Sequence, residues 1–315
     1  MPNFKKAEST RVVVIGTGFV GSTAAYTMMI QGVASEIVLI DVNQNKCEGE
    51  ALDIEHAISF APETKVWAGE YRDCKDADVV VIAAGINQKP GQTRLELAQT
   101  NVKIITDVVK NICKYTKDAI ILMVTNPLDV LTYTALKASG FPKNQVFGTG
   151  TTLDSSRFRY LLGKKFGVDP HSVGGYLIGE HGDSELAVYS HANVMGENIT
   201  SLPDYDKNAA EAAYVRTRDS AQEIICKKGA TYYGIAAAVS RIVRSILNDE
   251  DHAYSVSSLM DGEQGAKDVC VSLPSIVGRT GIKRVLDIKL SADEKKKFQK
   301  SVQIIRKSLD AAGVK

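Results

Sequence analysis

A histidine between two glycines is the residue of this chain best suited to move a proton. His181 lies in the segment IGEHGDSE, after a short apolar run, with Gly179 and Gly182 on either side. Glycines allow the backbone to turn sharply, so the imidazole can project into a cleft. Histidine gives and takes protons near neutral pH. His181 is therefore the candidate proton shuttle, although a lone histidine more often has a structural role. Histidines without this setting are His56, His171, His191 and His252.

A carboxylate and a guanidinium lie three residues apart in the segment GTTLDSSRFR, as Asp154 and Arg157. A histidine base needs a carboxylate to fix its tautomer and to stabilise the imidazolium. If the segment is helical, the two side chains share one face. Asp154 could then orient the histidine while Arg157 holds an anion through two hydrogen bonds. The alternative is an ordinary surface ion pair. A neutral polar group, Asn126, ends a predicted strand in the segment VTNPLD.

A glycine-rich loop near the start of the chain is typical of dinucleotide binding. The segment GTGFVG, with Gly16, Gly18 and Gly21, follows an apolar run directly. Glycines there permit a tight turn, close approach to a pyrophosphate and close packing of helix on strand. Asp41 ends the next predicted strand, where an acid holds a ribose hydroxyl and would repel a 2′-phosphate. We therefore expect NAD rather than NADP; the alternative role for Asp41 is a helix cap.

The pattern of apolar runs indicates the elements that position these residues. Short β-branched runs predict strands at residues 11–15, 36–40, 79–84 and 119–124. Helical spacing between them follows Arg94, at Leu97, Asn101, Ile104, Val108 and Ile112. Alternating strands and helices predict a doubly wound parallel sheet, whose ligand crevice lies beyond the carboxyl ends of the strands.

The second half of the chain has a different pattern. Residues 210–228 and 231–247 predict helices separated near Gly229, and residues 253–278 predict a strand pair around Asp261 and Gly262. The chain closes on a helix with a capping box, Ser291 and Glu294. We expect an NAD-binding Rossmann domain at residues 1–150 and an α+β substrate-binding domain at residues 151–315.

Composition excludes several classes of partner. The 315 residues carry a formal net charge of +1, which argues against nucleic acid or an anionic membrane surface as the main partner. No apolar stretch is long enough to span a bilayer, and the first residues lack the apolar core of a secretory signal. The five cysteines are scattered, and no histidine stands at metal-ligand spacing beside one. Free thiols in a reducing cytoplasm and no metal site are the simplest interpretation.

Five motifs together carry a family resemblance. GTGFVG, NQKPGQTR, VTNPLD, GTTLDSSRFR and GEHGD, in this order, resemble the L-lactate/malate dehydrogenase superfamily, most closely its bacterial L-lactate dehydrogenases. The resemblance covers nearly the whole chain. It implies reversible, NAD-dependent hydride transfer between NADH and pyruvate, giving L-lactate, in a homotetramer.

The resemblance also implies a role for each matching residue. His181 would exchange the proton, Asp154 would hold its other ring nitrogen, and Arg157 would bind the substrate carboxylate. Arg94 would polarise the carbonyl and exclude water. Asn126 would hydrogen-bond the reacting oxygen, and Thr231 would line the pocket. The positions that match cofactor contacts are Gly16, Gly18, Val20, Gly21, Asp41, Gly85, Ile86, Val124 and Asn126.

The loop NQKPGQTR bears on which hydroxy acid is used. Malate-specific relatives carry an arginine at the position of Gln88, where it pairs with the second carboxylate of oxaloacetate. A neutral amide there favours pyruvate, unless Lys89 supplies the charge instead. Two alternatives stay open: a malate or bulkier 2-hydroxy-acid dehydrogenase of the same superfamily, and a non-catalytic NAD-binding protein.

One departure from the bacterial pattern concerns regulation. Many bacterial members bind fructose 1,6-bisphosphate through an arginine and a histidine at a subunit interface. Arg159 matches the arginine, but Gly174 stands at the position of the histidine. Half of the anion site is missing, so activation by this sugar bisphosphate is not expected.

Overall fold

A parallel sheet forms the first half of the molecule. The structure is a computed structural model that describes residues 9–86 and 93–314. Its first strands are β1 (Arg11–Ile15), β2 (Glu36–Ile40), β3 (Lys65–Ala68), β4 (Val79–Ile82), β5 (Ile120–Met123) and β6 (Val146–Gly148). They pair in the order β3-β2-β1-β4-β5-β6, all parallel. The four predicted strands are confirmed, with β4 and β5 each two residues shorter, and the order is that of a doubly wound sheet.

Four helices connect these strands: α1 (Phe19–Ile30), α2 (Gln44–His56), α3 (Arg94–Ile112) and α4 (Leu128–Ser139). The predicted helix after Arg94 begins with a capping box in which Thr93 and Glu96 bond each other's backbone N–H groups. Apolar side chains of α3 and α4 pack on one face of the sheet, and those of α1 and α2 pack on the other. Both faces are therefore covered, as the continuous apolar strands require.

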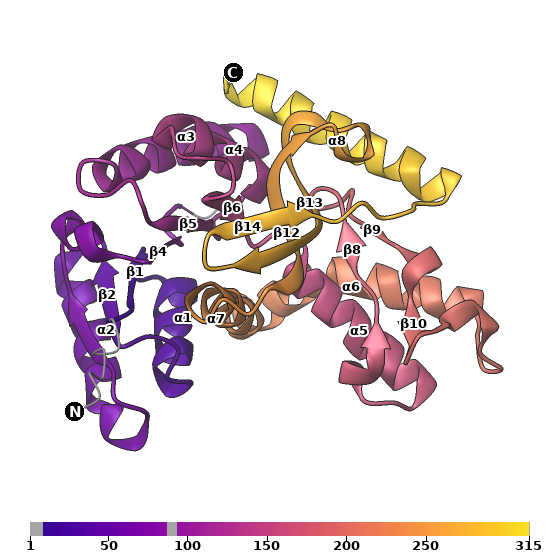
Figure 1. Cartoon of the computed structure of the whole chain (residues 1–315), viewed down its shortest axis with the longest axis horizontal. Helices are drawn as coiled ribbons and strands as arrows, with labels where there is room; N and C mark the ends of the chain where they lie inside the picture. Colours follow the sequence, from indigo (N-terminus) through magenta and orange to yellow (C-terminus); the bar gives the residue numbers. More distant parts are fainter. Residues whose placement is uncertain (1–8, 87–92, 315) are drawn as a thin grey trace, which may run out of the picture.

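The second half contains longer helices and very short strands (Figure 1). Its helices are α5 (Thr152–Phe166), α6 (Lys207–Lys228), α7 (Tyr233–Leu247) and α8 (Ala292–Ala312). Its short strands are β7 (Val173–Gly174), β8 (Leu177–Ile178), β9 (Leu186–Ala187), β10 (Asn193–Val194) and β11 (Glu197–Asn198). Short 3-10 helices occur in both halves. Those of the first half are Ile58–Phe60 and Tyr71–Asp76, and those of the second half are Pro170–Ser172, Tyr189–His191, Ile199–Ser201 and Glu263–Gly265. The predicted break between α6 and α7 is confirmed at Gly229, whose φ of +85° is left-handed.

The predicted strand pair is confirmed and has an unexpected neighbour. Strands β12 (His252–Asp261) and β13 (Lys267–Gly278) pair antiparallel, and β14 (Gly281–Val285) follows. β12 also pairs with β6, where Ser257 lies opposite Gly148, so these three strands extend the parallel sheet to nine strands. The sheet therefore crosses residue 150.

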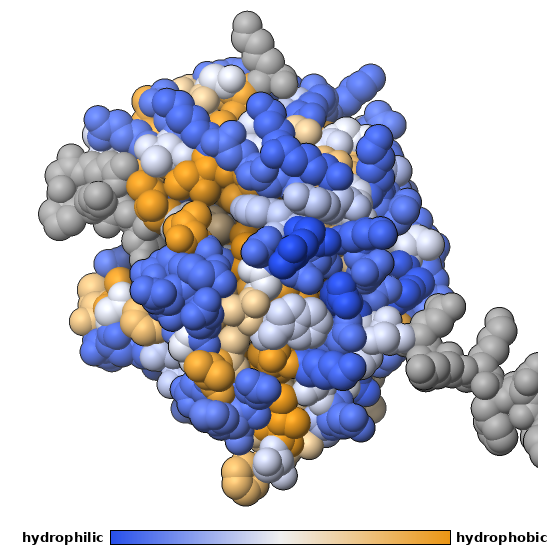
Figure 2. Space-filling model, turned by 90° about the vertical axis from the view of Figure 1, so that its left-hand side faces the viewer, coloured by the Kyte–Doolittle hydropathy of each residue, from blue (hydrophilic) through white to orange (hydrophobic). Residues whose placement is uncertain are grey.

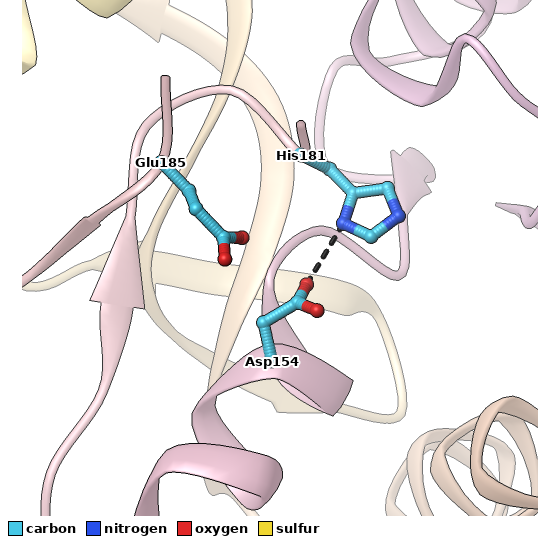
Figure 3. Close-up of side chains that lie close together, drawn as sticks. All are labelled: Asp154, His181 and Glu185. Atoms are coloured by element: carbon cyan, nitrogen blue, oxygen red, sulfur yellow. Dashed lines mark hydrogen bonds and ion pairs between the residues drawn. The ribbon is translucent and has the colours of Figure 1, made fainter. Parts of the chain in front are cut away.

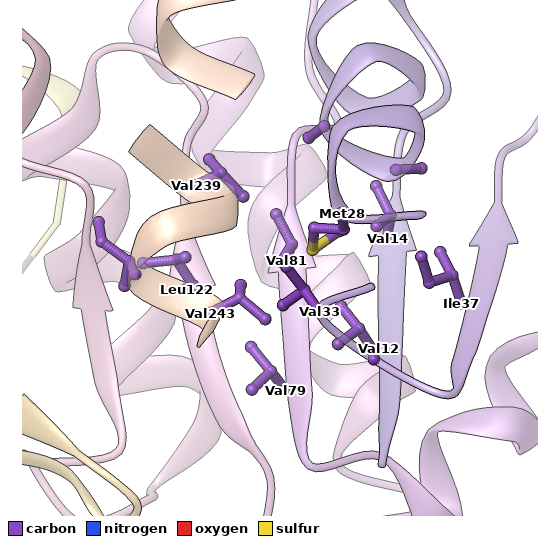
Figure 4. Packing of buried hydrophobic residues seen from close by; sticks show 14 of the residues in the cluster. Val12, Val14, Met28, Val33, Ile37, Val79, Val81, Leu122, Val239 and Val243 are labelled. Carbon is purple, nitrogen blue, oxygen red and sulfur yellow. The ribbon is translucent and has the colours of Figure 1, made fainter. Parts of the chain in front are cut away.

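The main core also crosses residue 150. Val239 and Val243 of α7 pack with Val79, Val81 and Leu122 of the parallel strands, and α7 lies beside α1 (Figures 1 and 4). The division into domains at residues 1–150 and 151–315 stays a prediction. Among the described residues, no helix is both long and apolar enough to cross a membrane.

Candidate active site

The glycine-rich loop leaves the amino end of α1 open. Gly16 has a φ of +96°, and a Cβ there would lie 2.5 Å from the backbone nitrogen of Ala84. A Cβ on Gly21 would lie 1.8 Å from the carbonyl oxygen of Gly16, so neither position accepts a side chain. Gly18 caps α1 with no side-chain hydrogen bond and faces open space. These features fit a phosphate held by backbone N–H groups and the helix dipole.

Asp41 lies at the end of β2 and faces this loop. Its Oδ2 accepts hydrogen bonds from the N–H and hydroxyl of Thr17, at 2.7 and 3.1 Å, and Oδ1 accepts one from the N–H of Asn43. Burial raises the pKa of Asp41, but the bonds from Asn43 and Thr17 outweigh it and hold the pKa below its ordinary value. Asn43, rather than Asp41, caps α2. The carboxylate is therefore ionised and free of the helix-cap role considered for it.

A buried asparagine joins the loops that follow β4 and β5. Gly85, Ile86, Val124 and Asn126 all lie just beyond these strands. Asn101 of α3 is fully buried; its Oδ1 accepts from the N–H of Ile86 at 3.0 Å. Its Nδ2 donates to the carbonyl oxygens of Ile86 and Asn126. In the sequence, Asn101 is a polar residue among the apolar positions of the helix. That exception could have indicated that it bonds to the neighbouring loops.

His181 and Asp154 form a hydrogen-bonded pair, as predicted from their types (Figure 3). The Nδ1 atom of His181 lies 2.8 Å from Oδ2 of Asp154. Asp154 is in the first turn of α5, whereas His181 follows β8 in a loop whose Gly179 has a φ of +96°. The imidazole is 27% exposed and the Asp154 side chain 4% exposed. One edge of the ring is thus fixed by the protein while part of it stays accessible.

Arg157 is the second partner of Asp154. Its Nη1 donates to Oδ1 of Asp154 at 2.9 Å, and its side chain is 15% exposed. The pair is therefore mostly buried rather than a surface pair, and Asp154 bonds both His181 and Arg157. A guanidinium has five N–H donors, so this bond leaves capacity to hold a carboxylate.

Asp129 fixes the main chain of His181, a role that the sequence did not indicate. The buried Asp129 lies in the first turn of α4; its Oδ2 accepts the N–H of His181 at 2.8 Å. Its Oδ1 accepts the hydroxyl of Ser257 at 2.6 Å. Burial raises the pKa of Asp129 to about 6 in spite of these bonds. A charged residue within the apolar segment LDVLTYTAL was the signal that could have identified it.

The carboxylates around His181 set its protonation. Burial lowers the pKa of His181, but the charge and hydrogen bond of Asp154, with a smaller effect of Asp129, raise it to about 9. Burial raises the pKa of Asp154, and His181 and Arg157 together bring it below its ordinary value. At neutral pH the pair is an imidazolium beside a carboxylate, ready to donate a proton.

Asp154, His181 and Glu185 also have the composition of a small metal site. Their potential ligand atoms lie within 4.8 Å of one another. Both oxygens of Asp154 already accept hydrogen bonds, from Arg157 and His181, and a cation would have to break them. The geometry therefore favours proton transfer over metal binding.

Other predicted residues are placed less completely. Gln88 and the side chain of Arg94 lie outside the described residues; the backbone of Arg94 begins α3. Val20 is half-buried in the first turn of α1, and Thr231 is half-buried between α6 and α7.

Comparisons with known proteins agree with this arrangement. Residues 10–148 match the family model for the NAD binding domain of lactate/malate dehydrogenases, and residues 151–314 match the alpha/beta C-terminal domain. L-lactate dehydrogenase 1 of Bacillus cereus is 48% identical over 95% of this chain and 97% of its own. A probable L-lactate dehydrogenase of Schizosaccharomyces pombe is 46% identical over 98% of this chain and 94% of its own.

Solved structures show the same likeness. The ligand-bound minor L-lactate dehydrogenase of Enterococcus mundtii has a TM-score of 0.94 at 45% identity, covering 96% of this chain and 98% of its own. A lactate dehydrogenase from a Medee basin deep-sea metagenome library also has a TM-score of 0.94, at 42% identity, covering 97% of this chain and 99% of its own. The motifs, the doubly wound sheet and these matches all agree: the chain belongs to the lactate/malate dehydrogenase family.

Proposed function

We propose that the protein is an NAD-dependent L-lactate dehydrogenase that reduces pyruvate to L-lactate and catalyses the reverse reaction. The observation that carries the chemistry is the buried Asp154 bonded to the partly exposed ring of His181. NADH supplies the hydride when bound, and the protein must supply a proton to the developing alkoxide. The names of the relatives support pyruvate and L-lactate as the substrate pair.

The side chains divide the remaining tasks. His181 donates the proton from Nε2, because its Nδ1 is bonded to Asp154. Asp154 stays ionised and stabilises the imidazolium. Arg157 binds the substrate carboxylate, and Arg94 polarises the carbonyl and excludes water. Asn126 hydrogen-bonds the reacting oxygen, and Thr231 lines the pocket.

The cofactor is assigned to the edge of the sheet where β1, β2, β4 and β5 end. Asp41 would hold the ribose and the loop at Gly16 the pyrophosphate. The other residues assigned to NAD are Gly18, Val20, Gly21, Gly85, Ile86, Val124 and Asn126. We also propose that residues 1–150 form the NAD-binding domain and residues 151–315 the substrate domain. The extents of the two family matches support this division.

The deciding experiment follows NADH absorbance with pyruvate, oxaloacetate and a bulkier 2-oxo acid as substrates. We expect the highest kcat/KM with pyruvate. A higher value with oxaloacetate would favour malate dehydrogenase, and a higher value with the bulky acid would favour another 2-hydroxy-acid dehydrogenase. If NADH binds but no acid is reduced, the protein is a non-catalytic NAD-binding protein.

The protonation of His181 predicts the pH dependence of the two directions. Pyruvate reduction needs the imidazolium, so kcat/KM for pyruvate should stay level below the pKa of about 9 and fall as pH rises through it. Lactate oxidation needs the neutral imidazole, so its rate should rise over the same range. Profiles of both directions with saturating cofactor test this. A fall of pyruvate reduction already near pH 6.5, the ordinary pKa of histidine, would contradict it.

The allosteric site of bacterial relatives is proposed to be inactive here. A Cβ on Gly174 would lie 2.3 Å from Nδ2 of Asn193, so the side chain of Asn193 occupies the space of the missing histidine. Nη1 of Arg159 donates to the carbonyl oxygen of Gly175 at 3.3 Å. Adding fructose 1,6-bisphosphate should leave the pyruvate concentration at half-saturation unchanged in steady-state assays. A several-fold drop would refute this.

We further propose that the protein is a cytoplasmic homotetramer. Exposed apolar side chains lie on α1, α2 and the 3-10 helix Ile58–Phe60, and the face drawn in Figure 2 carries groups of apolar residues among polar ones. Large apolar patches on a soluble protein usually mark an interface. All five cysteines are free thiols, which supports a reducing compartment. Sedimentation analysis of the full chain tests the assembly.

A further inference from the structure

A third carboxyl group, that of Glu185, lies beside the His181–Asp154 pair. Glu185 is 4% exposed, and its Oε1 is buried with no partner among the described residues. A carboxyl oxygen of Glu185 lies within 4.8 Å of the ligand atoms of Asp154 and His181. Figure 3 shows the carboxyl group turned toward the pair. No step of the proposed reaction uses it.

The main chain holds Glu185 in this position. Its N–H donates to the carbonyl oxygen of Gly182 at 3.2 Å. Its carbonyl oxygen accepts the hydroxyl of Tyr214, from α6, at 2.6 Å. The next residue, Leu186, begins β9 and pairs with Ile178 of β8. The main chain of Glu185 is therefore fixed on both sides of its Cα.

The charges around Glu185 favour its neutral form. Asp154 and Arg157 act on it from α5, His181 from the loop, and Tyr214 and Arg218 from α6. Two further acids act indirectly: Asp183 acts on Arg218, and Asp129 of α4 acts on His181. An ionised Glu185 would be a second buried anion beside Asp154 with no hydrogen bond to compensate it. Burial and Asp154 raise the pKa of Glu185 well above its ordinary value, although His181, Arg157 and Arg218 act the other way.

We propose that Glu185 carries a proton in the resting enzyme and is a positioning residue for the His181–Asp154 pair. As a neutral acid it occupies the space beside the pair and excludes water from it. It does not compete with Asp154 for an ion pair with the His181 imidazolium. It also preserves the charge of the site. A neutral Glu185 adds no further negative charge near Arg157, the proposed partner of the substrate carboxylate; this last point rests on the proposed function.

The first experiment records infrared spectra of the full-length wild-type protein and of Glu185→Gln, without substrate. At about pH 8 the other buried acid of the site, Asp129, lies well above its pKa of about 6. We expect a carbonyl stretch of a protonated carboxylic acid in the wild type, shifted in D₂O and missing in Glu185→Gln. A matched control is Glu180→Gln in the same loop, whose carboxyl accepts a hydrogen bond from Ser184; it should keep the band. If wild-type and Glu185→Gln spectra are identical, the proposal is wrong.

Kinetics provides a second, separable readout. Glutamine keeps a neutral group of the same shape, so Glu185→Gln should keep kcat within about threefold and leave the fall of pyruvate reduction near the same pH. Glu185→Ala admits water beside Asp154 and should lower kcat about tenfold or more, with little change in KM. If Glu185→Gln instead moves the fall in rate about one pH unit lower, Glu185 is ionised and the proposal fails. The infrared band needs no activity, so failure of pyruvate turnover would overturn the proposed function without deciding this inference.

Discussion

Replacing His181 with asparagine is expected to lower kcat for pyruvate reduction by roughly 10²- to 10⁴-fold. The asparagine amide can occupy much of the same space but cannot release a proton near neutral pH. Binding of NADH should change little, because His181 is not among the residues assigned to the cofactor. Stopped-flow measurement of a single turnover separates this loss from slow product release. A loss smaller than tenfold would show that another group supplies the proton.

Asp154→Asn tests the same pair from its other side. Without the carboxylate, burial is the main remaining influence on His181, so its pKa should fall from about 9 toward or below its ordinary value. The rate of pyruvate reduction at neutral pH should then be lower than in the wild type. The pH at which this rate declines should also be lower. The chain also contains a matched surface pair: Nδ1 of His171 lies 2.7 Å from Oδ1 of Asp169, with both side chains exposed. Asp169→Asn should leave rate and pH profile unchanged.

Much of the fold was predictable because its signals are local. β-branched runs such as Arg11–Ile15 and Glu36–Ile40 became strands at the expected residues. Gly16, Gly18 and Gly21 could be assigned because their spacing directly after a strand is a pattern that consecutive residues reveal. The capping box at Ser291 also confirmed its helix start. Each of these features depends on neighbours within one turn or one strand.

The continuation of the sheet could not be predicted in this way. Ser257 of β12 pairs with Gly148 of β6, and α7 packs against strands from the first half of the chain. Both contacts join residues about a hundred or more positions apart, and the apolar pattern of a strand does not name its partner. The change of pattern near residue 150 indicated a boundary in sequence, but the sheet and the core continue across it.

The sequence predicted the His181–Asp154 pair of the candidate site but not the other residues around it. His181 and Asp154 could be matched because a histidine base requires a carboxylate. Asp129 and Glu185 are also acids near His181, but only the tertiary structure shows their environments. Asp129 accepts a main-chain N–H, and Oε1 of Glu185 is buried with no partner in the part of the chain that the structure describes. Acids of these types are usually exposed, so composition gives no sign that they are buried.

The choice between lactate and malate chemistry gives the other large expected effect. Gln88→Arg should raise the ratio of oxaloacetate to pyruvate turnover by roughly a hundredfold or more. This expectation comes from the sequence and the family resemblance, since Gln88 lies outside the described residues. Oxaloacetate has a second carboxylate, and enclosing it without a cation costs several kcal/mol. At about 1.4 kcal/mol per tenfold, supplying that cation accounts for a change of this size.

A change of the same chemistry in the same loop separates a specific contact from a general charge effect. Gln92→Arg adds an identical side chain four residues away in the sequence. If residue 88 lies beside the second carboxylate of bound oxaloacetate, only Gln88→Arg should change the ratio of kcat/KM for oxaloacetate to that for pyruvate. Equal changes in both variants would indicate long-range attraction of the dianion instead. The ratio could also stay the same in both variants while oxaloacetate is already a good substrate of the wild type. In that case Lys89 or another cation pairs with the second carboxylate. If Arg157 binds the carboxylate that all these acids share, as proposed, a second cation helps only a substrate with a second negative charge.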